Sequence, residues 1–341
     1  MKKGIIYVLL CTLVIVTAVP ISVHGTSKMT SSLITGNTLY VGGSGPNNYT
    51  RIQDAIDNAS DGDTVFVFDD SSPYQENIVV DKSLTLLGEN ETTTIIEGGN
   101  LSDCVVLHAA GVTLQGFTLR HASGSDYGVR IGSSNNVIRG NIITNNMIGI
   151  YLRGVNSNFI DDNKITQNSY GGIYQYNCND TTISNNTITG ATHYGGICIF
   201  YESYRALINY NTISDNINGI NIGQSNENTI TRNTIVENRV GVGLDMSSKN
   251  LISQNNIQKN AKPVILNGLS WHLAKERWYR NTFDGNYWGR PIVLIKPILG
   301  VMLLVYNVND QGGNGIGFNI FGILPIIKYD YHPAQEPYGM G

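Results

Sequence analysis

Four aspartates are the residues of this chain best suited to acid–base chemistry. Asp161 and Asp162 are adjacent, and Asp180 and Asp215 follow them in the same repetitive part of the chain. Two carboxyl groups at a suitable separation could hydrolyse a glycoside. The two positions that correspond to Asp161 and Asp162 in the next repeat carry Ser and Asn, so no column of carboxylates forms. Solvated turn residues are the alternative interpretation of all four.

A second set of residues could bind sugar rings. Side chains alternate between inward and outward along a strand, and three successive repeats place aromatic and basic residues at outward positions. Exposed aromatic rings beside hydrogen-bonding groups suit a saccharide ligand. The alternative is packing between neighbouring strands, with an insertion at 192–194 folded over the patch. The candidate glycan-binding residues are Arg130, Tyr151, Arg153, Tyr174, Tyr176 and Phe200.

An internal repeat must position both sets. The motif Asn-x-Ile returns every 22 to 25 residues, accompanied by a Gly-aliphatic pair and a second Asn. A period of this length with three short aliphatic segments predicts three strands per turn of a solenoid. We therefore predict an all-β fold, a single right-handed parallel β-helix, in which equivalent Asn side chains stack as a hydrogen-bonded ladder. The ladder residues are Asn141, Asn163, Asn186, Asn211, Asn233 and Asn255.

The segment before the repeats is expected to close the first coil. A strand is expected at 39–41, followed by a short amphipathic helix that Thr50 would cap and that would bury Ile52, Ala55, Ile56 and Ala59. Further strands are expected at 64–67, 77–80, 83–87, 94–97, 105–108 and 112–119. A helix at this end would protect strand edges and core side chains from water.

These motifs resemble those of known β-helix proteins. The segments 49–56, 62–65 and 74–78 look like the opening of many pectin-lyase-like proteins, and the Asn-x-Ile-x-x-Asn repeats resemble the NosD-type repeats of exported archaeal and bacterial proteins. The resemblance covers residues 38 to 260 and is specific for fold. It carries little information on activity, because this fold supports lyases, hydrolases, epimerases and binding proteins.

The resemblance also raises the question of metal. β-Helix polysaccharide enzymes often use calcium, and the NosD name implies copper, which clusters of His, Met or Cys bind. The candidate donors occupy different columns of the repeat, and buried Cys commonly acts as a small apolar residue. They are His108, His121, His193, Met147, Met246, Cys178 and Cys198. We assign no metal site and no organic cofactor, while calcium and copper remain open.

The domain organisation follows from these patterns. We expect a signal peptide at 1–25 (or a retained anchor), a polar linker at 26–37, the β-helix at 38–260 and a C-terminal cap and tail at 261–341. Within the β-helix, 38–64 is the N-terminal cap and about 135–260 the regular coils.

The function classes are limited by export and charge. The chain is expected outside the cytoplasmic membrane, at the cell surface, in the periplasm or secreted, with membrane attachment only through an uncleaved N-terminus. A net charge of −4 argues against nucleic acid. The leading hypothesis is a module that binds polysaccharide or cell-envelope glycan without cleaving it. A polysaccharide lyase or glycoside hydrolase, a structural adhesion solenoid and a copper-maturation protein remain alternatives; oligomeric state and ligand identity stay open.

Overall fold

The structure of the protein is a computed structural model that describes residues 36–99, 102–121, 126–269, 281–289, 296–307, 318–330 and 332–339. The expected signal peptide at 1–25 and the expected linker up to residue 35 lie outside the described residues. Among the described residues, no helix is both long enough and apolar enough to cross a membrane.

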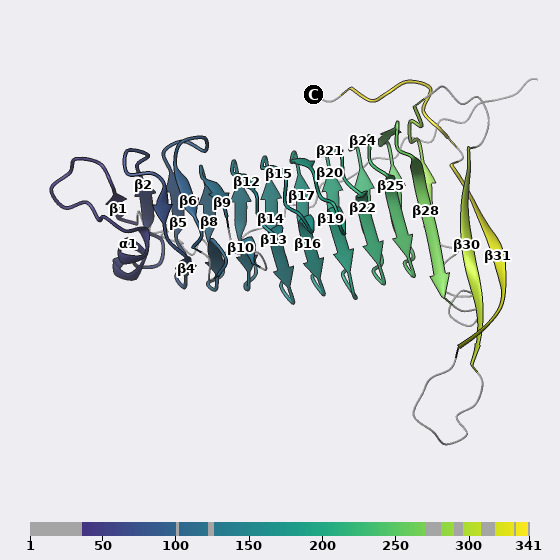
Figure 1. The fold of residues 1–341 in the computed structure, drawn as a ribbon, viewed down its shortest axis with the longest axis horizontal. Coiled ribbons are helices and arrows are strands. Elements are labelled where there is room, and N and C mark those ends of the chain that lie inside the picture. The colour runs from purple at the N-terminus through teal and green to yellow at the C-terminus, as the bar shows by residue number, and fades with distance from the viewer. Residues whose placement is uncertain are drawn as a thin grey trace, which may run out of the picture. The chain divides into compact units, whose positions relative to one another are not determined.

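Short parallel strands wind into the predicted right-handed parallel β-helix (Figure 1). Each regular coil gives one strand to each of three parallel stacks. The first stack contains β4 (Ile78–Val80), β7 (Val105–Leu107), β10 (Tyr127–Ile131), β13 (Ile148–Arg153), β16 (Gly171–Tyr176), β19 (Gly195–Phe200), β22 (Asn218–Gly223), β25 (Val240–Asp245) and β28 (Lys262–Leu269).

The second and third stacks contain shorter strands. The second contains β1 (Thr38–Val41), β2 (Thr64–Val67), β5 (Thr85–Gly88), β8 (Thr113–Gln115), β11 (Val137–Arg139), β14 (Phe159–Asp161), β17 (Thr182–Ser184), β20 (Leu207–Asn209), β23 (Thr229–Thr231), β26 (Leu251–Ser253) and β29 (Thr282–Asp284). The third contains β3 (Tyr74–Gln75), β6 (Ile95–Glu97), β9 (Thr118–Arg120), β12 (Ile142–Thr144), β15 (Lys164–Thr166), β18 (Thr187–Thr189), β21 (Thr212–Ser214), β24 (Thr234–Val236) and β27 (Asn256–Gln258).

Aliphatic columns fill the interior of the coils. In the third stack, for example, Ile143, Ile165, Ile188 and Ile213 stand in register, and each is fully buried. Burial of apolar surface contributes about 25 cal/mol per Å², so each added coil extends one continuous core. The expected single segment at 112–119 is instead two strands, β8 and β9, because Gly116 turns the chain with a φ of 82°.

The Asn ladder lies at the corner between the second and third stacks. The backbone nitrogen and Nδ2 of each ladder Asn donate to Oδ1 of the Asn in the next coil, at 2.9–3.1 Å. Nδ2 also donates to backbone carbonyls, as from Asn186 to Ile160 and Ser184. The ladder thus pairs the buried backbone N–H of each Asn at the corner and gives carbonyls at the neighbouring strand ends a further donor.

The N-terminal helix α1 (Ile52–Asn58) contacts β1, β2 and β4, at the end of the chain of stacked coils (Figure 1). Its buried face contains the residues expected from the sequence. The expected cap at Thr50 is wrong: Arg51 is the N-cap residue and makes no side-chain cap. The Glu76 carboxylate accepts hydrogen bonds from the Ile52 and Gln53 backbone nitrogens instead, at 2.8 and 3.1 Å. A residue 24 positions away in sequence therefore caps the helix.

The stacked strands continue beyond the expected boundary at residue 260. β28 pairs with β25 and β29 with β26, and Asn286 accepts from Asn255 as the next member of the ladder. The step between these two Asn is 31 residues, and this longer interval conceals the repeat in the sequence. β30 (Lys296–Asn307) then pairs in parallel with β28, and β31 (Phe318–Asp330) pairs antiparallel with β30.

Asp330 ends the ladder. Its Oδ2 accepts from the backbone nitrogen and Nδ2 of Asn286 at 3.0 and 3.2 Å, as the Oδ1 of a further Asn would. The same oxygen accepts from Trp288 Nε1 at 3.0 Å, while Oδ1 accepts from Gly285 and His332 backbone nitrogens. The fully buried carboxylate thereby satisfies the donors of the last ladder member.

Candidate functional site

Aromatic side chains gather on the outer face of two neighbouring coils. Tyr174 and Tyr176 point outward from β16, and Phe200 points outward from β19, which pairs with β16 in register. Three more tyrosines flank these strands and are 38%, 42% and 48% exposed: Tyr170, Tyr194 and Tyr201. We call these six residues the aromatic band: Tyr170, Tyr174, Tyr176, Tyr194, Phe200 and Tyr201. The band runs along the strand direction, across the first stack.

The rings of the band contact one another. Tyr174 lies 5.3 Å from Phe200 and 5.5 Å from Tyr194 between ring centroids, and Tyr176 lies 4.6 Å from Tyr201. Tyr194 belongs to the insertion at 192–194, so this segment does pack against the patch. It adds its own aromatic ring and leaves that ring partly exposed, and it does not hide the patch completely.

A row of rings extends from the band along the solenoid. Tyr127, Tyr151 and Tyr174 stack in successive coils, with centroid distances of 4.4 and 5.8 Å and interplanar angles of 21° and 26°. Both faces of the Tyr151 ring therefore meet another ring. The contacts of Tyr151 are therefore those of packing between neighbouring coils. Only the ring edge and the hydroxyl group of Tyr151 are left to contact a ligand.

The basic candidates are already engaged by neighbours. Arg130 Nε lies 2.6 Å from Asp103 Oδ2, and the Arg153 guanidinium lies 5.3 Å from the centroid of the Tyr176 ring. Burial raises the pKa of the Asp103 carboxyl, opposed by hydrogen bonds from Tyr127 and the charge of Arg130. Burial also raises the pKa of Tyr174, so its hydroxyl stays protonated at neutral pH and can donate or accept a hydrogen bond.

The regular ladders are interrupted in the same two coils. A second Asn column includes Asn136, Asn158, Asn228 and Asn250, with Thr181 and Ala206 at the intervening positions. A third column is interrupted at Ala191, which comes directly before the 192–194 insertion. Among the described residues, Asn158 Nδ2 and Thr181 Oγ1 are buried without a hydrogen-bond partner.

Gln175 compensates for part of this interruption. It points into the core at a position where other coils carry Ile or Leu, and it is fully buried. At later coils, Nδ2 of Asn228 and Asn250 donates to the corner carbonyl of the preceding coil. Ala206 cannot make the corresponding bond to the Cys178 carbonyl, and Gln175 Nε2 donates to it instead, at 3.0 Å. Gln175 Oε1 has no partner among the described residues.

The four aspartates are not brought together. Asp162 lies at the corner between β14 and β15, Asp180 at the corner between β16 and β17, and Asp215 at the corner between β21 and β22. These are three different corners of the coil. Asp180 forms a two-pronged ion pair with Arg205, at 2.7 Å for both contacts, and this hydrogen bonding lowers its pKa.

Asp161 is also held by neighbours in the next coil. The Ser184 hydroxyl donates to Asp161 Oδ1 at 2.6 Å, and Asn185 Nδ2 donates to the same oxygen at 2.7 Å. These contacts give Asp161 a place in a surface hydrogen-bond network. No second carboxylate within that network would complete the acid–base pair that glycoside hydrolysis needs.

The His and Cys candidates for copper also lie apart. Within the described part of the chain, no group of three His, Cys, Asp or Glu side chains could hold a metal ion. Cys178 and Cys198 are buried, and burial raises the pKa of both thiols. Cys198 points outward in register with Tyr174, yet it is fully buried among the rings of the band. His193 stacks on Tyr170 at 4.4 Å.

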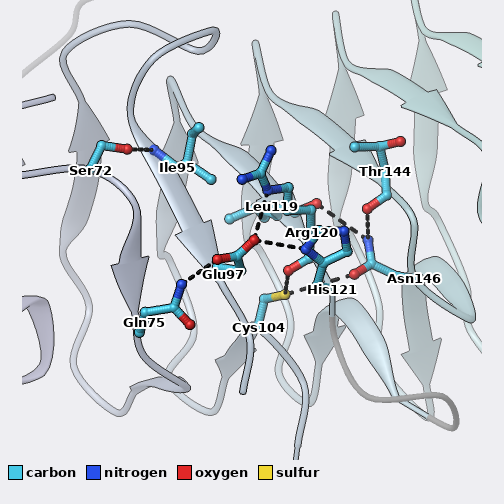
Figure 2. Close-up of polar contacts among 10 residues, drawn as sticks. All are labelled: Ser72, Gln75, Ile95, Glu97, Cys104, Leu119, Arg120, His121, Thr144 and Asn146. Carbon is cyan, nitrogen blue, oxygen red and sulfur yellow. Dashed lines mark hydrogen bonds and ion pairs between the residues drawn. The ribbon is translucent and has the colours of Figure 1, made fainter. Parts of the chain in front are cut away.

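His121 belongs to a separate polar cluster on the third stack (Figure 2). Its Nδ1 lies 2.8 Å from Glu97 Oε1, and Arg120 Nε lies 3.1 Å from the same oxygen. Gln75 donates to the other Glu97 oxygen. The hydrogen bonds from His121 and Gln75 lower the pKa of Glu97. The nearby Cys104 thiol is directed to the Arg120 carbonyl at 3.3 Å.

Sequence reasoning missed the parts of the band that lie outside the strands. It considered only outward strand positions, whereas Tyr170 and Tyr194 precede their strands and Tyr201 follows β19. The offset of 25 residues in this part of the repeat was the available signal, because extra residues at corners enlarge the outer surface.

Comparisons with known proteins place the chain in a family and a fold. The sequence model described as "Periplasmic copper-binding protein (NosD)" matches residues 56–292. A cell surface glycoprotein of Methanothermus fervidus is 29% identical; the match covers 51% of this chain and 38% of that protein. The chain thus spans well under half of that relative.

Solved structures with low sequence identity share the fold. The A-module of a mannuronan C-5 epimerase from Azotobacter vinelandii superposes with a TM-score of 0.52 at 18% identity, covering 70% of this chain and 82% of that one. An alginate lyase from a Paenibacillus species has a TM-score of 0.50 at 14% identity, covering 74% and 87%. At these identities the likeness establishes the β-helix architecture alone.

Proposed function

We propose, on the premise that the chain belongs to the NosD family, that it is an exported surface protein whose aromatic band binds polysaccharide without cleaving it. The observation that carries this proposal is the gathering of six aromatic side chains on the outer face of two adjacent coils. A large patch of exposed apolar side chains on the surface of a soluble protein commonly marks a binding site.

The departures from the repeat support the same location. In the two coils of the band, two Asn columns are interrupted, a core position carries Gln, and an insertion adds Tyr194. The interrupted columns and Gln175 give up hydrogen bonds or apolar packing that neighbouring coils retain. Sites at which a chain departs from its own structural rule are commonly functional, because function compensates for the lost stability.

The chemistry of the band suits a saccharide. The apolar C–H face of a sugar ring packs on an aromatic ring, and its hydroxyl groups need nearby donors and acceptors. Tyr201 offers an exposed ring with a hydroxyl group, and the Arg153 guanidinium lies over the neighbouring Tyr176 ring. A long polymer would cross the first stack along the band, and Tyr194 and Tyr201 lie at its two ends.

The contacts of the carboxylates support binding rather than cleavage. The Asp180 carboxylate is committed to Arg205, and Asp161 is committed to the next coil. A hydrolase needs one carboxyl group with a raised pKa beside a second that stays ionised, and hydrogen-bonded Asp180 has a lowered pKa.

Copper binding does not fit the described residues. A copper site needs several His, Met or Cys donors within one coordination sphere. The described Cys side chains are buried. His121 follows β9 and His193 follows β18, in coils that are not adjacent, and each has its own contact, with Glu97 and with Tyr170. No step of the proposal therefore runs through copper, although the family description names it.

The location at the cell surface rests on two supports. The N-terminal sequence has the pattern of an export signal, with Lys2 and Lys3 before an apolar run. The relative in Methanothermus fervidus is named a cell surface glycoprotein. Its name is compatible with a surface solenoid that meets cell-envelope glycans.

Retention of the purified exported chain on acidic and neutral polysaccharides tests the proposal. We expect selective retention that Tyr174→Ala with Tyr176→Ala abolishes while the circular dichroism spectrum stays β-rich. Appearance of new reducing or unsaturated ends in the retained polymer would instead favour the lyase or hydrolase. If a folded sample is retained on none of the polymers, a purely structural role for the solenoid would be the remaining function.

A further inference from the structure

Six Asn-x-Ser/Thr sequences give the chain candidate sites for N-linked glycans. An Asn-rich repeat produces such matches by chance, so the sequence alone does not distinguish them. Transfer onto a folded exported protein requires an accessible Asn amide and an accessible hydroxyl group two residues later. The candidates are Asn48, Asn58, Asn90, Asn100, Asn179 and Asn185; Asn100 lies outside the described residues.

Asn90 lies on an exposed turn between β5 and β6. Residues 89–93 are all exposed. Asn90 Oδ1 accepts from the Thr92 backbone nitrogen at 2.9 Å and from the Thr92 hydroxyl at 2.7 Å, so the two reactive side chains of the motif already lie together on the surface. Within the described part of the chain, Asn90 Nδ2 makes no hydrogen bond. The nitrogen that would receive a glycan is therefore available.

Three other candidates have an engaged amide nitrogen. Asn48 Nδ2 donates to the Gly42 carbonyl at 2.6 Å, and Asn58 Nδ2 donates to a carbonyl of its own helix at 2.8 Å. Asn185 Nδ2 donates to Asp161 Oδ1 at 2.7 Å. Glycan transfer at any of these positions would first break a hydrogen bond that belongs to the folded structure.

Asn179 fails for a different reason. The hydroxyl of its motif belongs to Thr181, which is fully buried at a corner of the coil. Asn179 Oδ1 also accepts from the Tyr204 backbone nitrogen at 3.0 Å, in a contact between neighbouring coils. Exposing the hydroxyl would require the corner of the solenoid to open.

We propose that Asn90 is the N-glycosylation site among the five candidates that the structure describes, with a lipid-linked oligosaccharide as the donor and an oligosaccharyltransferase as the catalyst. The Asn90 Nδ2 atom forms a bond to C1 of the first sugar, and the bond from C1 to the lipid phosphate oxygen breaks. Nδ2 loses one proton, and the lipid phosphate leaves with the electron pair of the broken bond. The transfer needs no oxidant or reductant.

The position of Asn90 leaves the aromatic band uncovered. Asn90 lies at the corner between the second and third stacks, whereas the band lies on the first stack, in later coils. The modification is independent of the glycan-binding proposal, because it concerns a glycan attached to the chain and not one bound by it.

Glycopeptide mass spectrometry of the full chain, exported from cells that N-glycosylate a secreted reference protein, tests the proposal. We expect a glycan on the peptide that contains Asn90. Asn90→Gln and Thr92→Ala should each remove one whole glycan mass from the intact protein, Thr92→Ser should retain it, and Asn58→Gln should change nothing. An unmodified Asn90, whether another site is occupied or none is, would overturn the proposal.

Discussion

The ladder predicts a large loss of stability from one buried Asn. Asn186 Oδ1 accepts from the backbone nitrogen and Nδ2 of Asn163, and its own Nδ2 donates to the Ile160 and Ser184 carbonyls and to Asn211 Oδ1. Asn186→Ala leaves the buried Asn163 backbone N–H without its partner and removes one hydrogen bond from each of the Ile160 and Ser184 carbonyls, of which Ser184 keeps the Asp162 backbone nitrogen as a donor. An unsatisfied buried group costs about 1–3 kcal/mol and a lost hydrogen bond about 0.5–1.5 kcal/mol, so we expect a loss of about 2–4 kcal/mol after partial relaxation.

Urea unfolding followed by circular dichroism measures this loss. Thr187→Ala is the matched control, because Thr187 is the next residue and its side chain is exposed; we expect it to cost about 0.5 kcal/mol. Because each coil contacts only its neighbours, hydrogen exchange should show the loss centred on the coils around residue 186. A cost below about 1 kcal/mol for Asn186→Ala, or one equal to the control, would refute the assignment of stability to the ladder.

Three further predictions follow from the contacts. Ala206→Asn restores the donor that Gln175 replaces, so it should lower the cost of Gln175→Leu by at least about 0.5 kcal/mol in a double-mutant cycle; additive effects would contradict this account. Asp330→Ala should expose the last coil to hydrogen exchange while earlier coils stay protected, and uniform protection would argue against a terminating role. Because the pKa of Glu97 is lowered, its ionised carboxylate stabilises the fold above the ordinary Glu pKa of about 4.3, and this stabilisation is lost as the pH falls. The melting-temperature difference between wild type and Glu97→Gln should therefore shrink from about pH 6 to about pH 3. A difference that stays constant over this range would contradict the ion pair.

The regular part of the fold was predictable because each coil repeats the same chemistry. Ile at a fixed place in each repeat, followed by a ladder Asn, specifies an inward side chain and a corner, and the structure has both. The α1 cap was not predictable, because Glu76 reaches it from the next coil and no local motif reports that contact. The end of the solenoid was missed because a 31-residue step separates Asn255 from Asn286.

The candidate site was predictable only in part. Strand alternation identified Tyr174 and Tyr176 but did not show that Tyr151 lies between two rings. Ring orientation depends on the side chains of neighbouring coils, which periodicity does not specify. Tyr194 and Tyr201 stand at corners, where insertions change the register and where alternation no longer assigns a direction.

Two matched tyrosines offer the most direct test of the aromatic band as a glycan-binding surface. Tyr201 and Tyr210 are both exposed and both adopt a left-handed φ, at 50° and 56°, but only Tyr201 belongs to the band. Gly adopts this backbone conformation without strain, so Tyr201→Gly and Tyr210→Gly should fold equally well. We expect Tyr201→Gly to weaken binding of the retained polysaccharide, with a dissociation constant about tenfold higher, and Tyr210→Gly to leave the constant unchanged. Equal affinities for both variants and the wild type would contradict the proposed role of the band.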